Sequence, residues 1–69
     1  MNEKLERLVE EMVSRGIRFD DASREFERRF ISRVLADSDG NLSKAADVLG
    51  MHRNTLSRKV VEHRLKRRP

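Results

Sequence analysis

The apolar residues of this chain recur at helical spacing and fall into four segments, separated by glycines at positions 16, 40 and 50. No stretch alternates β-branched and polar residues in the way that is typical of a strand. In the first segment, the apolar residues between Leu5 and Val13 lie three or four positions apart, which places them on one stripe of a helix. The pattern therefore predicts an all-α fold.

The second segment is apolar over an unusually wide sector. It begins near residues 19 to 21, where Asp20 and Asp21 put negative charge at a helix N-terminus, and it is expected to end at about Asp37. Its apolar residues cover more than half of a helical wheel, so we expect this helix to be buried on two sides. The second side could be covered by the remaining helices or by a second copy of the chain, and we favour the second copy. The residues expected in such a dimer interface are Leu8, Met12, Phe26, Phe30, Ile31 and Val34.

The C-terminal part of the chain is predicted to form a helix-turn-helix. Asn41 follows a turn and is a natural N-cap for a short third helix over residues 42–49. Gly50 ends that helix, and a fourth helix is expected to start after position 52, with Leu56 and Val60 as its buried stripe. Two helices joined by three residues that begin with glycine, the second helix being basic, form the arrangement of a DNA-binding helix-turn-helix.

Length and charge limit the number of domains and the class of partner. A chain of 69 residues allows one domain, and 41% charged against 36% apolar residues predict a core that is marginal for a monomer. Residues 1–40 carry eight Lys and Arg against ten Asp and Glu, a net charge of −2, whereas residues 41–69 carry eight against two, a net charge of +6. This asymmetry favours a polyanionic partner, with nucleic acid first and an anionic membrane surface second.

Several functions and locations are disfavoured by residues that the sequence lacks. There is no Cys, and His52 and His63 have no paired carboxylate at metal-ligand spacing, so we expect no metal, no cofactor and no small-molecule ligand. No serine has the context of a catalytic triad, so we expect no enzyme. No run of 18 apolar residues and no leader pattern is present, so we expect a cytoplasmic protein rather than a membrane protein.

Contacts to DNA can be assigned from the expected faces of the last two helices. Because Arg53 lies in the exposed first turn, it is the best residue for hydrogen bonds to guanine N7 and O6, a contact worth ~1–3 kcal/mol of discrimination. His52 either caps the fourth helix or points into the groove. Lys44 is as well explained by a solvated charge as by a phosphate contact. The predicted phosphate contacts are Asn41, Ser43, Lys44, Asn54, Thr55, Arg58 and Lys59.

Residues 40–59 read GNLSKAADVLGMHRNTLSRK and resemble the helix-turn-helix of the Fis family, which includes the C-terminal domains of NtrC-type activators. Residues 24–31 resemble the dimerisation helix of that family, so the resemblance covers about residues 17–63. It implies a single domain with dimerisation helices in residues 1–39, a helix-turn-helix in 40–65 and a basic tail in 66–69. It further implies a homodimer in the bacterial nucleoid, a transcriptional regulator or nucleoid-associated protein that bends its site and contacts bases through His52, Arg53 and Ser57.

The chain also departs from the pattern of the family. Ser57 stands where Fis itself has an arginine, which implies a different site preference. The family closes its last helix with a glycine, whereas residues 60–65 here read VVEHRL, and Val61 and Leu65 are expected on the outward face without an assigned role. The start at Met1 in an amphipathic helix favours a free-standing regulator over an excised domain. The alternative function is a helical interaction module whose basic end binds an acidic protein or an anionic membrane surface.

Overall fold

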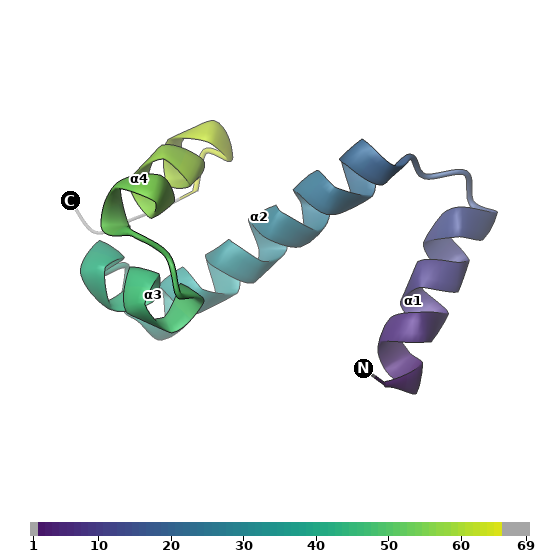
Figure 1. The fold of residues 1–69 in the computed structure, drawn as a ribbon, viewed down its shortest axis with the longest axis horizontal. Helices are drawn as coiled ribbons and strands as arrows, with labels where there is room; N and C mark the ends of the chain where they lie inside the picture. The colour runs from purple at the N-terminus through teal and green to yellow at the C-terminus, as the bar shows by residue number, and fades with distance from the viewer. Residues whose placement is uncertain (1, 66–69) are drawn as a thin grey trace.

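The computed structural model describes residues 2–65, and these residues form four α-helices and no strand (Figure 1). The predicted all-α fold is confirmed, and the predicted basic tail, residues 66–69, lies outside the described residues. None of the helices in the described part is long and apolar enough to cross a membrane. The helices are α1 (Glu3–Ser14), α2 (Phe19–Asp37), α3 (Leu42–Leu49) and α4 (Arg53–Glu62).

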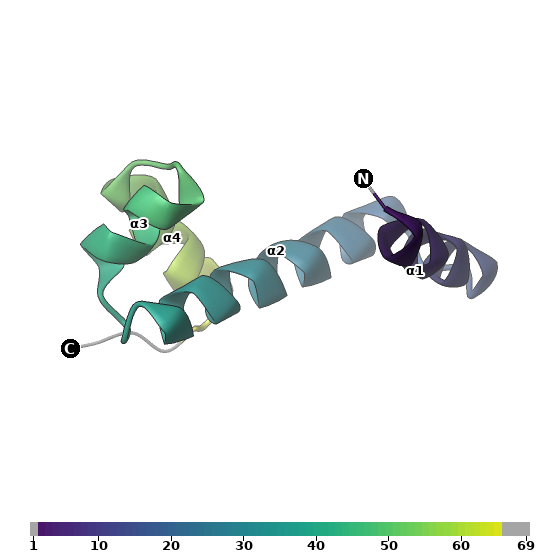
Figure 2. The same cartoon turned by 90° about the horizontal axis from the view of Figure 1, so that it is seen from below.

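The long helix α2 carries the other three helices at its two ends. The helices α3 and α4 lie together at its C-terminal end, and α1 folds back from its N-terminal end, away from them (Figures 1 and 2). The resulting shape is elongated, with extents of 40 × 23 × 17 Å. Extensive packing between helices occurs for α2 with α3 and for α3 with α4, whereas α1 contributes no buried residue.

The hydrophobic core lies entirely at the α3 and α4 end of the molecule. Its six buried apolar residues come in pairs from three helices: Ile31 and Leu35 of α2, Ala45 and Ala46 of α3, and Leu56 and Val60 of α4. The methyl side chains of the two alanines let α3 lie close to both of its neighbours. The expectation that Ile31 belongs to a dimer interface is therefore revised, because this side chain is 2% exposed and buried in the core of the single chain.

Three of the four helices start with a side chain that caps the first turn. Asn2 and Asn41 each accept a hydrogen bond, at 3.1 Å, from the backbone N–H three residues further along the chain. His52 caps α4 in the same sense, since its Nδ1 accepts from the backbone N–H of Asn54 at 3.0 Å. These bonds satisfy N–H groups that would otherwise lack a partner at the helix start. The predicted capping roles of Asn41 and His52 are confirmed.

All four helices of the described residues end in a left-handed turn. Gly16, Asp39, Gly50 and Arg64 have φ values of 76°, 53°, 71° and 54°, and after each of them the next residue donates its backbone N–H to a carbonyl of the last helical turn. At the end of α4, the N–H of Leu65 donates to the Val60 carbonyl at 2.9 Å, which turns the chain back over the core. Leu65 is consequently half-buried against that core, and the expectation that it faces outward is wrong.

We predict that Arg64→Gly raises the free energy of unfolding by about 0.5–1 kcal/mol, because Arg64 occupies a left-handed conformation that costs less for glycine. The matched control is Gly50→Ala, where an added Cβ would meet no atom within 4 Å, so the cost is purely conformational. This control should lower the free energy by about 1 kcal/mol. Urea unfolding of both variants measures the effect, and a loss of stability in Arg64→Gly would contradict the prediction.

Candidate nucleic-acid interface

The helix α4 is divided into a buried side and an exposed basic side. Leu56 and Val60 are 0% and 1% exposed, so they hold the inner side of the helix against α2 and α3. At the start of the helix the chain presents a different surface, which combines donors and positive charge. The predicted contact residues on that surface are His52, Arg53, Asn54 and Arg58, which are exposed, and Thr55 and Ser57, which are half-buried.

His52 can serve both of the roles that the sequence left open. Its Nδ1 accepts the capping hydrogen bond from Asn54, so the neutral ring carries its hydrogen on Nε2. Because the residue is exposed, the Nε2–H group is available as a donor to an external acceptor. Capping and a contact in a DNA groove are therefore compatible at this position.

The start of α3 lies on the chain just ahead of this surface and offers backbone donors. Asn41 caps the helix and is half-buried, whereas Ser43 and Lys44 in the first turn are exposed. The unpaired N–H groups and the positive end of the helix dipole favour an anion at such a terminus. The predicted phosphate contacts at Asn41, Ser43 and Lys44 thus remain predictions that the geometry permits.

Lys59 does not belong to the exposed basic surface in this structure. Its Nζ donates to Glu27 Oε1 on α2 at 2.9 Å, and its side chain is only 29% exposed. The charge is therefore paired with a carboxylate instead of being presented to solvent. The assignment of Lys59 as a phosphate contact is revised, because its ammonium group points toward α2.

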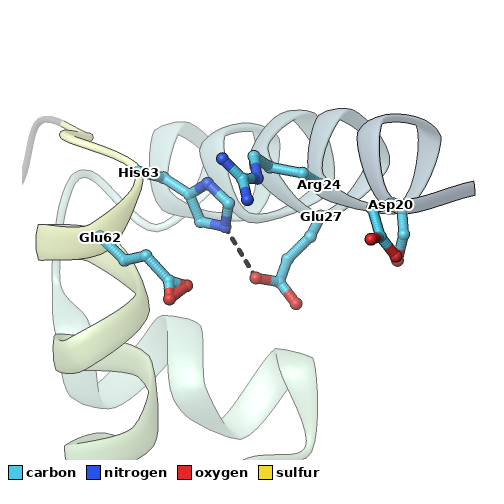
Figure 3. A pocket seen from close by; sticks show the side chains of 6 residues that line it. Asp20, Arg24, Glu27, Glu62 and His63 are labelled. Atoms are coloured by element: carbon cyan, nitrogen blue, oxygen red, sulfur yellow. Dashed lines mark hydrogen bonds and ion pairs between the residues drawn. The ribbon is translucent and has the colours of Figure 1, made fainter. Parts of the chain in front are cut away.

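Glu27 also accepts a hydrogen bond from the residue that ends α4. His63 Nε2 donates to Glu27 Oε2 at 2.7 Å, and Figure 3 shows the imidazole ring and the carboxylate facing each other between the two helices. The hydrogen bond from His63, followed by that from Lys59, lowers the pKa of Glu27 below its ordinary value of 4.5. We call this group of Glu27, Lys59 and His63 the anchor cluster.

The anchor cluster was not predicted from the sequence, since Lys59 and His63 lie 32 and 36 positions from Glu27. A signal was nevertheless present. Glu27 is four residues before the core residue Ile31, and Lys59 and His63 are four residues apart on the inner side of α4. Polar groups that face inward on two neighbouring helices need hydrogen-bond partners. Here α2 supplies a carboxylate, and α4 supplies an ammonium group and an imidazole.

Within the described residues, one histidine and two carboxylates lie close enough together to hold a metal ion. Glu27, Glu62 and His63 each offer one ligand atom within 4.8 Å of the others. They line a pocket of about 440 Å³ together with Asp20, Ser23 and Arg24 (Figure 3). Glu27 already accepts from a lysine and a histidine, so the Lys59 ammonium supplies the positive charge that a metal would bring.

An open apolar groove of about 390 Å³ lies between α1 and α2. Leu8 and Met12 line it from α1, and Phe26 and Phe30 line it from α2, with ring centroids 5.5 Å apart. Leu8, Phe26 and Phe30 are 49%, 58% and 51% exposed, while Val34 is half-buried against the core. Apolar side chains of this size are commonly covered in the functional form of a protein.

The chain is similar in sequence to known bacterial regulatory proteins. Residues 22–63 match the bacterial regulatory proteins of the Fis family. Over 49 residues the chain is 47% identical to the DNA-binding transcriptional regulator NtrC of Azospirillum brasilense, a match that covers 71% of this chain and 10% of that protein. The chain thus spans about a tenth of the length of this curated relative. No solved structure matches the chain significantly.

We predict that the stabilising effect of Glu27 disappears in acid. Since its pKa is lowered in the folded state, the ionised carboxylate stabilises the fold fully above the ordinary value of 4.5, and the contribution is lost as the pH falls through the folded-state pKa. The loss of stability caused by Glu27→Gln should therefore be larger at about pH 7 than at about pH 3 in urea unfolding.

The control for this experiment is Glu25→Gln on the same helix. Glu25 pairs with Arg29 at 2.6 Å, but both side chains are more than half exposed, so the effect should be small at either pH. A Glu27→Gln effect that is the same at both pH values would contradict the assignment of the ionised pair.

Proposed function

The chain belongs to the Fis family of bacterial regulatory proteins, and from that premise we propose that it is a homodimer that binds preferred DNA sequences through the exposed surface of α4. Its helix-turn-helix is that of a DNA-binding regulatory domain, a family role that is not enzymatic. The proposal places the protein on DNA in the bacterial cytoplasm and nucleoid. The observation that supports it is the division of α4, whose Leu56 and Val60 are buried in the core while Arg53, Asn54 and Arg58 stay exposed.

Reading of bases is assigned to the N-terminal part of α4. The major groove admits one helix, and the first turns of that helix come closest to the base edges. Arg53 is exposed in the first turn and can donate two hydrogen bonds to a guanine, and His52 Nε2 offers a further donor beside it. The side chain of Ser57 is short, so a base contact there would specify a different sequence from one made by arginine.

Contacts to the DNA backbone are assigned to residues around the base-contacting part of α4. The first turn of α3 presents Asn41, Ser43 and Lys44, and the outer side of α4 presents Asn54, Thr55 and Arg58. Such contacts set the register of a protein on the duplex and supply most of the salt-dependent affinity. Lys59 is left out of this set because Glu27 neutralises it.

The homodimer is supported by the apolar groove between α1 and α2. A monomer would leave all three phenylalanines more than half exposed, two of them in this groove, and would bury no residue of α1. A second copy that inserts its own α1 and α2 into the groove would cover Leu8, Met12, Phe26 and Phe30 and would place two α4 helices on one duplex. If the two helices meet adjacent major grooves less than one turn apart, the duplex has to bend.

We predict strongly salt-dependent binding to duplex DNA, tested on a site selected from a random duplex pool. If the dimer neutralises about eight phosphates, the affinity should fall by ~10³–10⁵ between 50 and 200 mM salt, because condensed counterions are released on binding. Arg53→Ala should reduce the preference for the selected site, whereas Arg58→Ala should weaken binding to all sequences and reduce the salt slope by about 2 for the dimer. Fluorescence anisotropy measures all three quantities.

Two results would contradict this assignment. Equal effects of Arg53→Ala and Arg58→Ala on preference and slope would refute the division of roles. Binding that does not respond to salt, or binding to anionic vesicles or an acidic protein in place of duplex DNA, would overturn the DNA-binding function and favour an interaction module.

We predict that Phe30→Asp yields a monomer that still folds. A charge in the groove opposes burial against a second copy, and Phe30 lies outside the buried core of the single chain. Analytical ultracentrifugation gives the mass, and far-ultraviolet circular dichroism checks that the helices persist. The control is Val48→Asp on α3, which is 66% exposed and away from the groove, and which should remain dimeric. A Phe30→Asp dimer would show that the interface lies elsewhere.

A further inference from the structure

We propose that Glu27 is a positioning residue that fixes the orientation of α4 relative to α2, and thereby the separation of the two α4 helices in the dimer. The inference rests on the proposed function, because it concerns how a dimeric reader of DNA sets the spacing of its two half-sites. Glu27 touches no DNA in this scheme and acts through Lys59 and His63.

The first step is that one carboxylate bonds two points of α4. Its Oε1 accepts from Lys59 at 2.9 Å and its Oε2 accepts from His63 at 2.7 Å, so each oxygen contacts a different turn of the helix. A single bond would leave α4 free to rotate about it, whereas two bonds to residues four positions apart oppose both rotation and sliding. His63 makes this restraint stiffer, since its side chain is only 4% exposed.

The second step is that the backbones of α2 and α4 come close at few positions, so their direct contact is made by side chains. Extensive packing joins α2 to α3 and α3 to α4, and the pair α2 and α4 is not among the extensively packed helices. Leu56 and Val60 share the core with Ile31 and Leu35, but apolar contacts carry little directional preference. Charge-assisted hydrogen bonds are directional and stronger than neutral ones, so the anchor cluster adds an orientational restraint on α4 to the packing of the core.

The third step connects the anchor cluster to the dimer interface. Glu27 lies in the chain next to Phe26, and both line an apolar depression of about 290 Å³ that includes Phe30 and Met51. The same stretch of α2 therefore contributes to the proposed interface on one side and holds α4 on the other. A change in the tilt of α4 at Glu27 alters the distance between the two reading surfaces, and this distance determines which half-site spacing fits.

The first test measures that geometry without DNA. The chain contains no Cys, so Val61→Cys, an exposed position on α4, accepts a single spin label in each subunit of the dimer. Electron paramagnetic resonance then reports the distribution of distances between the two labels. We expect a narrow distribution in the otherwise unchanged protein, a broadened or shifted one in Glu27→Ala and Glu27→Gln, and no change in the control Glu25→Gln.

The second test measures the consequence on DNA. Duplexes carry two selected half-sites at separations varied by single base pairs, and a further duplex carries one half-site. Glu27→Gln should reduce the preference for the best separation by at least about fivefold, because the charge-assisted bonds that hold α4 in each subunit are weakened. The affinity for the single half-site should change by less than about twofold. Lys59→Met should reproduce this result, since its charge serves the anchor cluster and not a phosphate.

The outcomes separate a positioning role from a merely structural one. If Glu27→Gln lowers the unfolding midpoint and the single half-site affinity together while the preferred separation and the label distances stay unchanged, the proposal is overturned. If Lys59→Met lowers only the salt slope, Lys59 is a phosphate contact and the proposal is again overturned. A failure of the proposed function is recognisable separately, as a parent protein that binds no duplex or shows no distance between labels.

Discussion

The burial of Leu56 and Val60 beneath the alanine pair of α3 is the constraint on which the rest of the molecule depends. Fully burying a side chain of this size contributes about 1.5–3 kcal/mol, and these are the largest side chains that the described part of the chain buries completely. Ala45 and Ala46 permit the contact because they add no bulk where the helices meet. With Leu56 and Val60 held in this way, Arg53 is exposed because it is the first residue of α4 and lies beyond the core.

The core is small and lies at one end of the molecule, which divides the chain into two parts of different character. Six buried apolar residues hold α3, α4 and the C-terminal half of α2 together. The N-terminal half of α2 and all of α1 also have apolar stripes. No residue of α1 is buried within the chain. The apolar side chains of the second part are exposed in the single chain, as the proposed homodimer requires of a surface that it would bury.

Electrostatic interactions join the two parts without adding to the basic surface. Formal charge along the chain counts Lys59 with the basic half, but in space its ammonium group pairs with a carboxylate of the acidic half. The basic surface that remains is made by residues that no such pair neutralises in the described structure, above all Arg53 and Arg58. Net charge therefore indicates the class of partner, whereas ion pairs decide which cations are free to contact it.

Local patterns in the sequence determined the helices, their order, the caps at Asn41 and His52, and the stripe of Leu56 and Val60, because all of these depend on residues within about one or two turns of each other. The tertiary structure alone decided three further points. Ile31 faces the core instead of a second copy, Leu65 folds back because Arg64 adopts a left-handed conformation, and Lys59 turns toward Glu27. Each of these depends on how one helix meets another or on a single backbone angle at a helix end, and hydrophobic periodicity carries no information on either.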